Sequence, residues 1–222
     1  YLADIVMPLQ ANEMNQMISG MQETTVKGVS FADFRTQNPL SPSVIPDAYC
    51  PIKACHVAPN HFDIHLALVK YLKQQGVFVS LDPAPYSRQV STENLAELLS
   101  FVDVFLPSEK EVKAICPGLS IEDALARLKK MVPVVIVKLG GAGVLVCQQS
   151  DNKIRRLPAF PTNAVNLNGA GDSFCGGFIV GMIETGDPLK AAYFGIISSS
   201  LTIETNTISE KLLLKRPLAE AR

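Results

Sequence analysis

From about residue 52 onward, short runs of apolar residues alternate with longer segments in which apolar positions follow a helical period. The clearest longer segment covers residues 61–75, where Ile64, Leu68, Tyr71 and Leu72 fall on one helical face. Apolar strands separated by amphipathic helices are typical of a parallel sheet that is covered on both faces. The expected strands are 52–58, 77–81, 102–106 and 134–139, and the expected helices are 61–75, 92–100, 108–115 and 121–130.

The last part of the chain adds a hairpin and two helices that are rich in small residues. A tight glycine turn follows the strand expected at 134–139 and leads into the hairpin. The expected elements are a strand at 144–147, the far hairpin arm at 151–157, helices at 170–184 and 188–204, and a polar helix near Ser209. These patterns predict a three-layer αβα fold with a mostly parallel central sheet, formed by a single α/β domain over residues 1–222.

The pattern is weaker before residue 50. Residues 28–34 form a candidate short strand and residues 38–46 are rich in proline, so we interpret this part as edge or connecting structure. The chain begins with Tyr1 and has no basic stretch followed by an apolar one near its start. We therefore expect no signal peptide, and we expect the natural start to be absent from this sequence.

Composition excludes several classes of protein. With 47% apolar and 18% charged residues among 222, the chain is too apolar to be disordered. The 20 basic and 21 acidic residues give a formal net charge of −1, which offers no electrostatic basis for binding nucleic acid or an anionic membrane. No apolar run approaches the roughly 18 residues of a membrane-spanning helix, so we expect a soluble protein. Five cysteines, mostly in apolar segments, favour reduced thiols in a cytoplasmic chain over a disulfide framework.

The most informative stretch is NLNGAGDSFCGGF at residues 166–178, where small residues open a helix. The backbone N–H groups of Gly169–Gly171 can converge on an anion at the helix N-terminus, where the macrodipole adds about half a positive charge. Asp172 then stands beside a phosphate that it repels, so its expected use is to accept a proton from a hydroxyl that attacks the phosphate. The alternative is a simple turn with an aspartate at a helix start, where Asp is common.

This stretch resembles the signature of the ribokinase-like (PfkB-type) family of carbohydrate and nucleoside kinases, in which Gly-Ala-Gly-Asp precedes a small residue, Phe and a glycine-rich helix. Residues 169–178 match it closely. Further landmarks follow the order of the family over roughly residues 50–222. They are LDP at 81–83, LPSEKE at 106–111 and VKLGGAG at 137–143. The resemblance implies a ribokinase-like fold.

The resemblance also implies an activity, transfer of the γ-phosphate of ATP to a hydroxymethyl group of a sugar or nucleoside, with Mg²⁺ as cofactor. By this likeness Asp172 is the catalytic base, and Glu111 helps to organise the hydrated Mg²⁺. The residues expected to hold charge on the transferring phosphoryl group are Gly169, Ala170 and Gly171. Those expected to border the nucleotide are Ser108, Lys138, Gly140, Gly143, Gly171 and the small residues near 195–200.

The chain also departs from the family pattern. Asn166 and Leu167 stand where the family has Asp and Thr, which removes a charge tied in many members to a monovalent-cation loop. Ser108 replaces an Asn and could still hydrogen-bond through water. Lys138 replaces a Thr beside the nucleotide, and it could either reach a phosphate or be solvated. The departures at Asn166, Leu167 and Ser108, together with the lid that we do not find, support an alternative function, a non-catalytic nucleotide-binding scaffold derived from a sugar kinase.

The N-terminal part matches least. The family has an early strand with an Asp, a Gly-Gly-Asn segment and a small β-sheet lid, none of which we find in residues 1–54. We interpret residues 1–54 as a weakly matched remnant of that region and residues 55–222 as the nucleotide-binding and catalytic core. Either the sequence lacks the lid or the protein has lost it. A homodimer is a candidate assembly, because such kinases often dimerise through the lid.

Other features admit two interpretations. His61 and His65 have the spacing of a zinc pair, but without a matching third ligand we favour exposed or helix-start histidines. Residues 153–156 are basic and are interpreted as a solvated hairpin tip rather than a phosphate patch. Gly177 and Gly181 suit close helix packing within a core. The glycines do not spell the Gly-x-Gly-x-x-Gly of a dinucleotide oxidoreductase.

Overall fold

The computed structural model describes residues 40–83, 90–151, 153–206, 218 and 221. Residue contacts divide the chain into two units, the larger of which is Ser41–Leu214 with Arg222. The fold below is that of the larger unit. The strand expected at 28–34 and the helix expected near Ser209 lie outside the described residues, and the domain boundaries proposed from the sequence stay a prediction.

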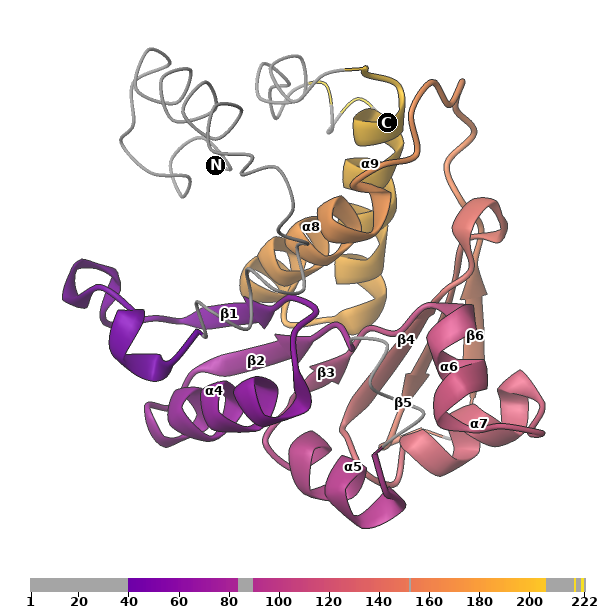
Figure 1. Cartoon of the computed structure of the whole chain (residues 1–222). Coiled ribbons are helices and arrows are strands. Elements are labelled where there is room, and N and C mark those ends of the chain that lie inside the picture. Colours follow the sequence, from indigo (N-terminus) through magenta and orange to yellow (C-terminus); the bar gives the residue numbers. More distant parts are fainter. Residues whose placement is uncertain (1–39, 84–89, 152, 207–217, 219–220, 222) are drawn as a thin grey trace, which may run out of the picture. The chain divides into compact units, whose positions relative to one another are not determined.

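A six-stranded sheet forms the middle layer (Figure 1). Its strands follow one another in chain order, with β1 to β4 parallel and β5 and β6 each antiparallel to the strand before it. The strands are β1 (Ala54–Val57), β2 (Phe78–Leu81), β3 (Val104–Phe105), β4 (Val134–Lys138), β5 (Val144–Gln148) and β6 (Ile154–Leu157). The predicted α/β class with a mostly parallel sheet is therefore confirmed.

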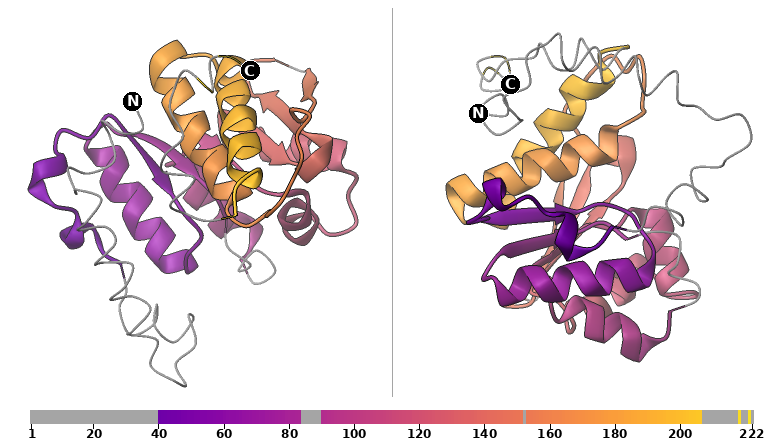
Figure 2. Two further views of the ribbon diagram at one scale, coloured as in Figure 1. Left: turned by 90° about the horizontal axis from the view of Figure 1, so that it is seen from above. Right: turned by 60° about the vertical axis from the view of Figure 1, so that its left-hand side comes forward.

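Helices cover both faces of this sheet (Figures 1 and 2). Side chains of β4 alternate between the two cores, Val135 and Val137 packing with the first helix group and Val134 and Ile136 with the second. The first group is α4 (Phe62–Gln74), α5 (Thr92–Leu99), α6 (Glu109–Ile115) and α7 (Ile121–Leu128). The second group is α8 (Ala170–Thr185) and α9 (Pro188–Ile203). Short 3₁₀ turns occupy Pro42–Val44, Asp47–Tyr49 and Gly140–Ala142.

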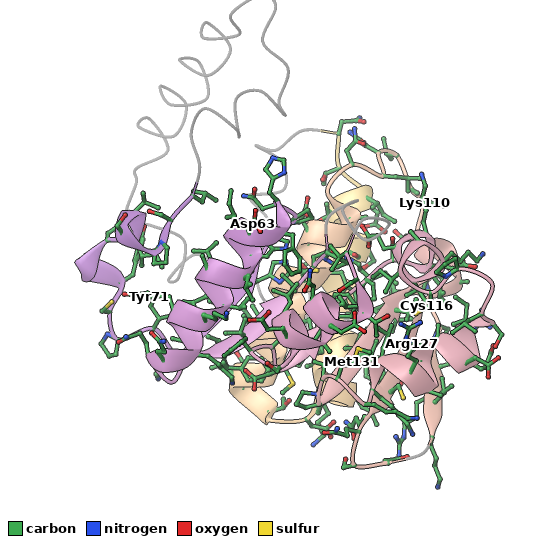
Figure 3. All side chains as sticks on the ribbon, turned by 60° about the horizontal axis from the view of Figure 1, so that its bottom comes forward. Asp63, Tyr71, Lys110, Cys116, Arg127 and Met131 are labelled. Carbon is green, nitrogen blue, oxygen red and sulfur yellow. The ribbon has the colours of Figure 1, made fainter. Side chains whose placement is uncertain are left out.

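Local hydrogen bonds fix where the helices of the first group begin. Ser91, Ser108 and Ser120 each precede a helix and accept the backbone N–H of the residue three positions later. The Arg127 guanidinium donates to Thr92 Oγ1 at 2.6 Å and so links α7 to the start of α5; Arg127 is labelled in Figure 3. Among the described residues, no helix combines the length and apolar character that crossing a bilayer demands.

Glycines let α8 and α9 pack closely, as the spacing of Gly177 and Gly181 predicted. A Cβ at Gly177 would lie 2.7 Å from both the Phe194 carbonyl oxygen and Ser198 Cβ. A Cβ at Gly181 would lie 2.7 Å from Ala191 Cα. The backbones of α8 and α9 therefore come into contact, and the two helices together cover one face of the sheet.

A Gly177→Ala variant is expected to lower the free energy of unfolding by about 1–3 kcal/mol, because the new methyl group meets backbone atoms that cannot move aside. Gly176→Ala is the matched control, since a Cβ there meets nothing within 4 Å. The control should raise stability by about 0.5–1 kcal/mol through helix propensity. Urea denaturation of both variants measures the difference, and equal stabilities would contradict the close approach of α8 and α9.

The bonding and burial of the cysteines and histidines can be compared with what the sequence predicted. All five cysteines are free; Cys116 and two others are buried, whereas Cys50 is exposed. His61 precedes α4 and is exposed, as a helix-start histidine should be. His65 is fully buried and its Nε2 lies 2.8 Å from the Ala58 carbonyl oxygen, so the expectation of an exposed side chain was wrong there. His65 lies on the core-facing side of α4, and the hydrogen bond with the Ala58 carbonyl oxygen makes a polar ring tolerable at that position.

Candidate active site

The turn before α8 takes the shape that an anion site needs. Gly169 is the N-cap residue and adopts a left-handed conformation with φ of 79°, which a residue with a side chain rarely adopts. Asn166 Oδ1 accepts the Asn168 N–H at 3.0 Å, while the N–H groups of Val165 and Asn166 both donate to the Ile203 carbonyl oxygen at the end of α9. The turn is thus held by α9 and by its own side chain.

The N–H groups at the start of α8 are largely open. The first four N–H groups of a helix have no acceptor within it, and here Ala170 N–H donates instead to the Leu167 carbonyl oxygen at 3.3 Å. Within the described part of the chain, that leaves the N–H groups of Gly169, Gly171 and Asp172 for a ligand, whereas the N–H of Ala170, which was also predicted to hold phosphoryl charge, is already engaged. Asp172 is exposed in the same turn. The structure therefore brings the predicted base to the predicted anion turn.

The glycine turn after β4 is compact because its backbone crosses that of the chain after β6. Gly143 has φ of 87°, and a Cβ there would lie 2.0 Å from the Leu157 carbonyl oxygen. Leu139 N–H donates to the Gly143 carbonyl oxygen at 2.9 Å and closes the turn. Gly140 is exposed, with φ of 58°. These features leave the predicted nucleotide-bordering glycines at one end of the sheet.

Ser108 and Glu111 form a capping box at the start of α6. Glu111 Oε2 accepts the Ser108 N–H at 2.7 Å and the Ser108 hydroxyl at 2.8 Å, and Glu111 N–H lies 3.3 Å from Ser108 Oγ. Among the described residues, Oε1 of Glu111 has no hydrogen-bond partner. Ser108 also forms a parallel bridge to Lys138, so α6 begins directly beside the end of β4.

A buried ion pair that the sequence analysis did not predict lies at the same end of the sheet. Asp82 follows β2 and Lys138 ends β4, and the Lys138 ammonium donates to Asp82 Oδ2 across the end of β3. The side chains are 7% and 13% exposed, respectively. Cys175 Sγ lies 3.8 Å from Asp82 Oδ2 and 3.7 Å from Lys138 Nζ. The sequence signal for this pair is a charged residue at the end of each of two apolar strands, which lie on either side of a third strand.

Burial dominates the electrostatics of this cluster. It raises the pKa of Asp82 to about 6 although Lys138 opposes the rise, and Glu111 and Asp172 add to it. Burial by itself lowers the pKa of Lys138, but Cys175, Asp82 and Glu111 reverse the effect and hold that pKa above its usual value. Burial also raises the pKa of the Cys175 thiol to about 12. Lys138 is therefore a cation and Cys175 a neutral thiol near pH 7.

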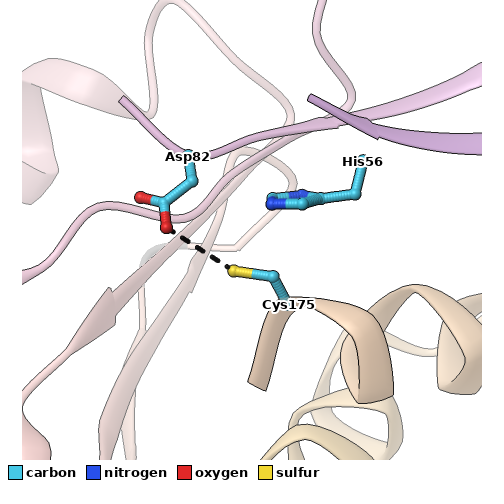
Figure 4. Close-up of side chains that lie close together, drawn as sticks. All are labelled: His56, Asp82 and Cys175. Atoms are coloured by element: carbon cyan, nitrogen blue, oxygen red, sulfur yellow. Dashed lines mark hydrogen bonds between the residues drawn. The ribbon is translucent and has the colours of Figure 1, made fainter. Parts of the chain in front are cut away.

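His56 completes the group from β1. Its Nδ1 lies 3.0 Å from Ser80 Oγ, and burial together with the Lys138 charge lowers its pKa to about 4. Figure 4 shows the side chains of His56, Asp82 and Cys175 turned toward one another, and their ligand-type atoms lie within 4.8 Å of each other. The Lys138 ammonium contacts Asp82 and Cys175, so a side-chain cation already holds two of the three groups that a metal ion would need there.

The site residues share one edge of the fold. Asp82, Ser108 and Lys138 lie at the carboxyl ends of β2, β3 and β4, and the first turn of α8 reaches the same edge, because a Cβ at Gly171 would lie 3.8 Å from Lys138 Nζ. Open α/β sheets bind ligands at this edge. A cavity of about 290 Å³ lies elsewhere, lined by residues that include Lys53, Phe78 and Gly186 near the opposite ends of β2 and α8. It belongs to no part of this site.

Comparison with known proteins decides the family. The family described as pfkB family carbohydrate kinase matches residues 57–212, which are most of the chain and include every predicted site residue. The chain belongs to the pfkB family of carbohydrate kinases. The resemblance inferred from the Gly-Ala-Gly-Asp turn and its ordered landmarks is therefore confirmed.

Individual pfkB relatives are distant and longer. A ribokinase from Lactococcus lactis is 29% identical over 171 residues, covering 75% of this chain and 54% of that protein. A cytidine kinase from Thermococcus kodakarensis is 31% identical over 148 residues, covering 66% and 53%. The structure of Thermotoga maritima ribokinase superimposes with a TM-score of 0.63 and 28% identity, covering 76% of this chain and 56% of that one. The chain thus spans about half the length of the curated relatives it matches.

Proposed function

We propose that the protein transfers the γ-phosphate of ATP to a hydroxymethyl group of a sugar or nucleoside. The observation that carries the proposal is the exposed Asp172 carboxylate in a helix turn whose N–H groups are open and over which the Lys138 ammonium lies. A carboxylate beside an anion site is useful where a hydroxyl must lose its proton as it attacks phosphorus. Membership of a carbohydrate kinase family supports the same reaction.

The roles follow from charge and position. Asp172 accepts the proton of the acceptor hydroxyl, so that the attacking oxygen carries negative charge only as its bond to phosphorus forms. The N–H groups of Gly169 and Gly171, with the positive end of the α8 dipole, stabilise the charge on the transferring phosphoryl group. Gly140, Gly143 and Ser108 border the nucleotide at the ends of β3 and β4.

ATP and Mg²⁺ are consistent with these residues. ATP supplies the phosphoryl group, and Mg²⁺ neutralises phosphate oxygens when bound. Open N–H groups and an ammonium suit a phosphate chain, and the structure of Arabidopsis thaliana ribokinase, with a TM-score of 0.57 and 25% identity to this chain, is described in complex with ribose and ATP. Glu111 Oε1 is left by the capping box to face a hydrated cation, a common use of a single carboxylate.

A Glu111→Gln variant is expected to raise the Mg²⁺ concentration for half-maximal activity by about tenfold, because a neutral amide holds metal-bound water less strongly than a carboxylate does. The amide oxygen can still accept the two Ser108 hydrogen bonds, so the start of α6 should persist. Mg²⁺ titration of the rate measures the change. An unchanged Mg²⁺ requirement would remove Glu111 from the metal site.

The proposed reaction is tested by measuring acceptor-dependent release of ADP, with Mg²⁺, against a panel of sugars and nucleosides. We expect at least one acceptor with a primary hydroxyl to stimulate ADP release well above the rate without acceptor. ATP that binds but is consumed with no member of the panel would contradict the proposal. That result would favour the non-catalytic scaffold, which is supported by the exposed Leu167 at a position where the family has a threonine.

A further inference from the structure

We propose that Asp82 is a positioning residue that holds the Lys138 ammonium over the first turn of α8 and releases it to the phosphate chain of the incoming nucleotide. This inference rests on the proposed function, which supplies the identity of the ligand. It adds that Asp82 holds Lys138 as a cation in reserve, and that Lys138 exchanges this carboxylate for phosphate when the nucleotide binds. Lys138 then binds phosphate rather than being solvated.

Position is the first observation. Lys138 Nζ stands 3.8 Å from where a side chain at Gly171 would begin, so the ammonium lies over the turn that presents open N–H groups. The lysine side chain is 13% exposed and comes from the end of β4. A cation and helix N–H groups that converge on one point form the donor set that a phosphate oxygen needs.

The partner of Lys138 is the second observation. Among the described residues, Oδ1 of Asp82 is buried and has no hydrogen-bond partner, while Oδ2 receives the ammonium. A buried carboxylate with one oxygen unsatisfied is a costly arrangement, because no described protein group replaces its lost hydration. The buried ion pair therefore contributes little to the stability of the fold. A phosphate chain, which has more negative charge and more acceptor oxygens than the Asp82 carboxylate, competes well for the ammonium.

Exchange of the ammonium changes the charge around Asp82. The groups that face it are Lys138 from β4, His56 from β1, Cys175 and Asp172 from α8, and Glu111 from α6. His56 and Cys175 are neutral near pH 7, so Lys138 is the cation among these described groups. Once Lys138 leaves, Asp82 remains buried near two carboxylates and takes up a proton. Nucleotide affinity therefore rises as the pH falls toward 6, until Asp82 is already protonated in the free protein.

The experiment is calorimetric titration of the full chain with Mg·ADP, and separately with adenosine, in two buffers of different ionisation heat near pH 7. The wild-type protein should bind Mg·ADP with net proton uptake. Lys138→Met should weaken Mg·ADP binding by about tenfold or more and leave adenosine affinity within about twofold. Asp82→Asn should bind Mg·ADP within about threefold of wild type, because Lys138 is kept, but with the extra proton uptake abolished.

Two further variants keep the test decisive. Lys138→Met combined with Asp82→Asn leaves no buried unpaired charge and should fold even if Lys138→Met alone does not; it should show the same weakened Mg·ADP binding. Lys73→Met is the matched control, because Lys73 pairs with Asp103 at 2.6 Å at the opposite end of the sheet. It should bind Mg·ADP as the wild type does.

The inference fails if the double variant binds Mg·ADP as tightly as wild type, if wild type does not bind it, or if proton uptake is equal in wild type and Asp82→Asn. Failure of the proposed function is a separate result, because binding of ADP requires no phosphoryl transfer. A chain that shows these binding differences but phosphorylates no acceptor would keep the cation exchange and lose the kinase activity.

Discussion

An Asp172→Asn variant is expected to lower kcat by about 10² to 10⁴ while the affinity for ATP changes by no more than about threefold. The amide cannot accept the proton of the acceptor hydroxyl, so the attacking oxygen must lose it to water or keep it until the bond to phosphorus is nearly complete. Binding should persist because the N–H groups of Gly169 and Gly171 and the Lys138 ammonium are unchanged. Steady-state rates and direct nucleotide binding, measured on the same preparation, separate the two effects.

Asp63→Asn is the matched control for this experiment. Asp63 lies in the first turn of α4, as Asp172 lies in the first turn of α8, so both changes remove a carboxylate from a helix N-terminus. Asp63→Asn should leave kcat within about twofold of wild type, because a first-turn carboxylate away from the site stabilises its helix by no more than about 1 kcal/mol. A kcat for Asp172→Asn equal to that of the control would exclude Asp172 as the base.

A Gly143→Ala variant is expected to lose about 3 kcal/mol or more of stability, the largest structural effect that we predict. The added methyl group would lie 2.0 Å from the Leu157 carbonyl oxygen and 2.7 Å from Ala159 N, and φ of 87° is itself unfavourable for alanine. Because the obstructing atoms are backbone atoms, the turn must open, and ATP binding should weaken with it. Thermal and urea unfolding measure the loss.

Gly141→Ala controls for the loss of glycine in the same turn. A Cβ at Gly141 meets nothing within 4 Å, and its φ is not in the left-handed region. The control should therefore be as stable as wild type or slightly more so, by the reduced entropy of the unfolded chain. If both variants were equally stable, the close crossing of this turn and the chain after β6 would be wrong.

The sequence predicted the layers well because buried positions recur along the chain with the period of the helix or strand to which they belong. The continuous apolar run at 134–139 became β4, whose residues face two cores, and the helical period at 61–75 became α4. Strand ends were less accurate: the run at 102–106 yields only Val104–Phe105, since strand pairing rather than hydrophobicity sets where a ladder ends. The two glycines of α8 indicated close packing because only a missing side chain permits backbone contact.

The site was predictable in part for the same reason. Asp172 and its glycines lie adjacent in sequence, so their spacing carries the chemistry directly. The pairing of Asp82 with Lys138 joins residues that are 56 positions apart and depends on strand order, which no local pattern encodes. Ser108 illustrates the converse, because its position before Glu111 also spells a capping box and the structure uses it as one. Its place beside the nucleotide stays a prediction.

The measurement that tests the central claim most directly is the phosphorus NMR spectrum of a reaction that contains the full chain, Mg·ATP and an acceptor with a primary hydroxyl. We predict loss of the γ-phosphate signal, growth of ADP, and a new phosphomonoester signal split by the methylene protons of the acceptor, with no such signal for Asp172→Asn in the same time. Release of inorganic phosphate alone, or an ester that forms equally fast with Asp172→Asn, would contradict the account.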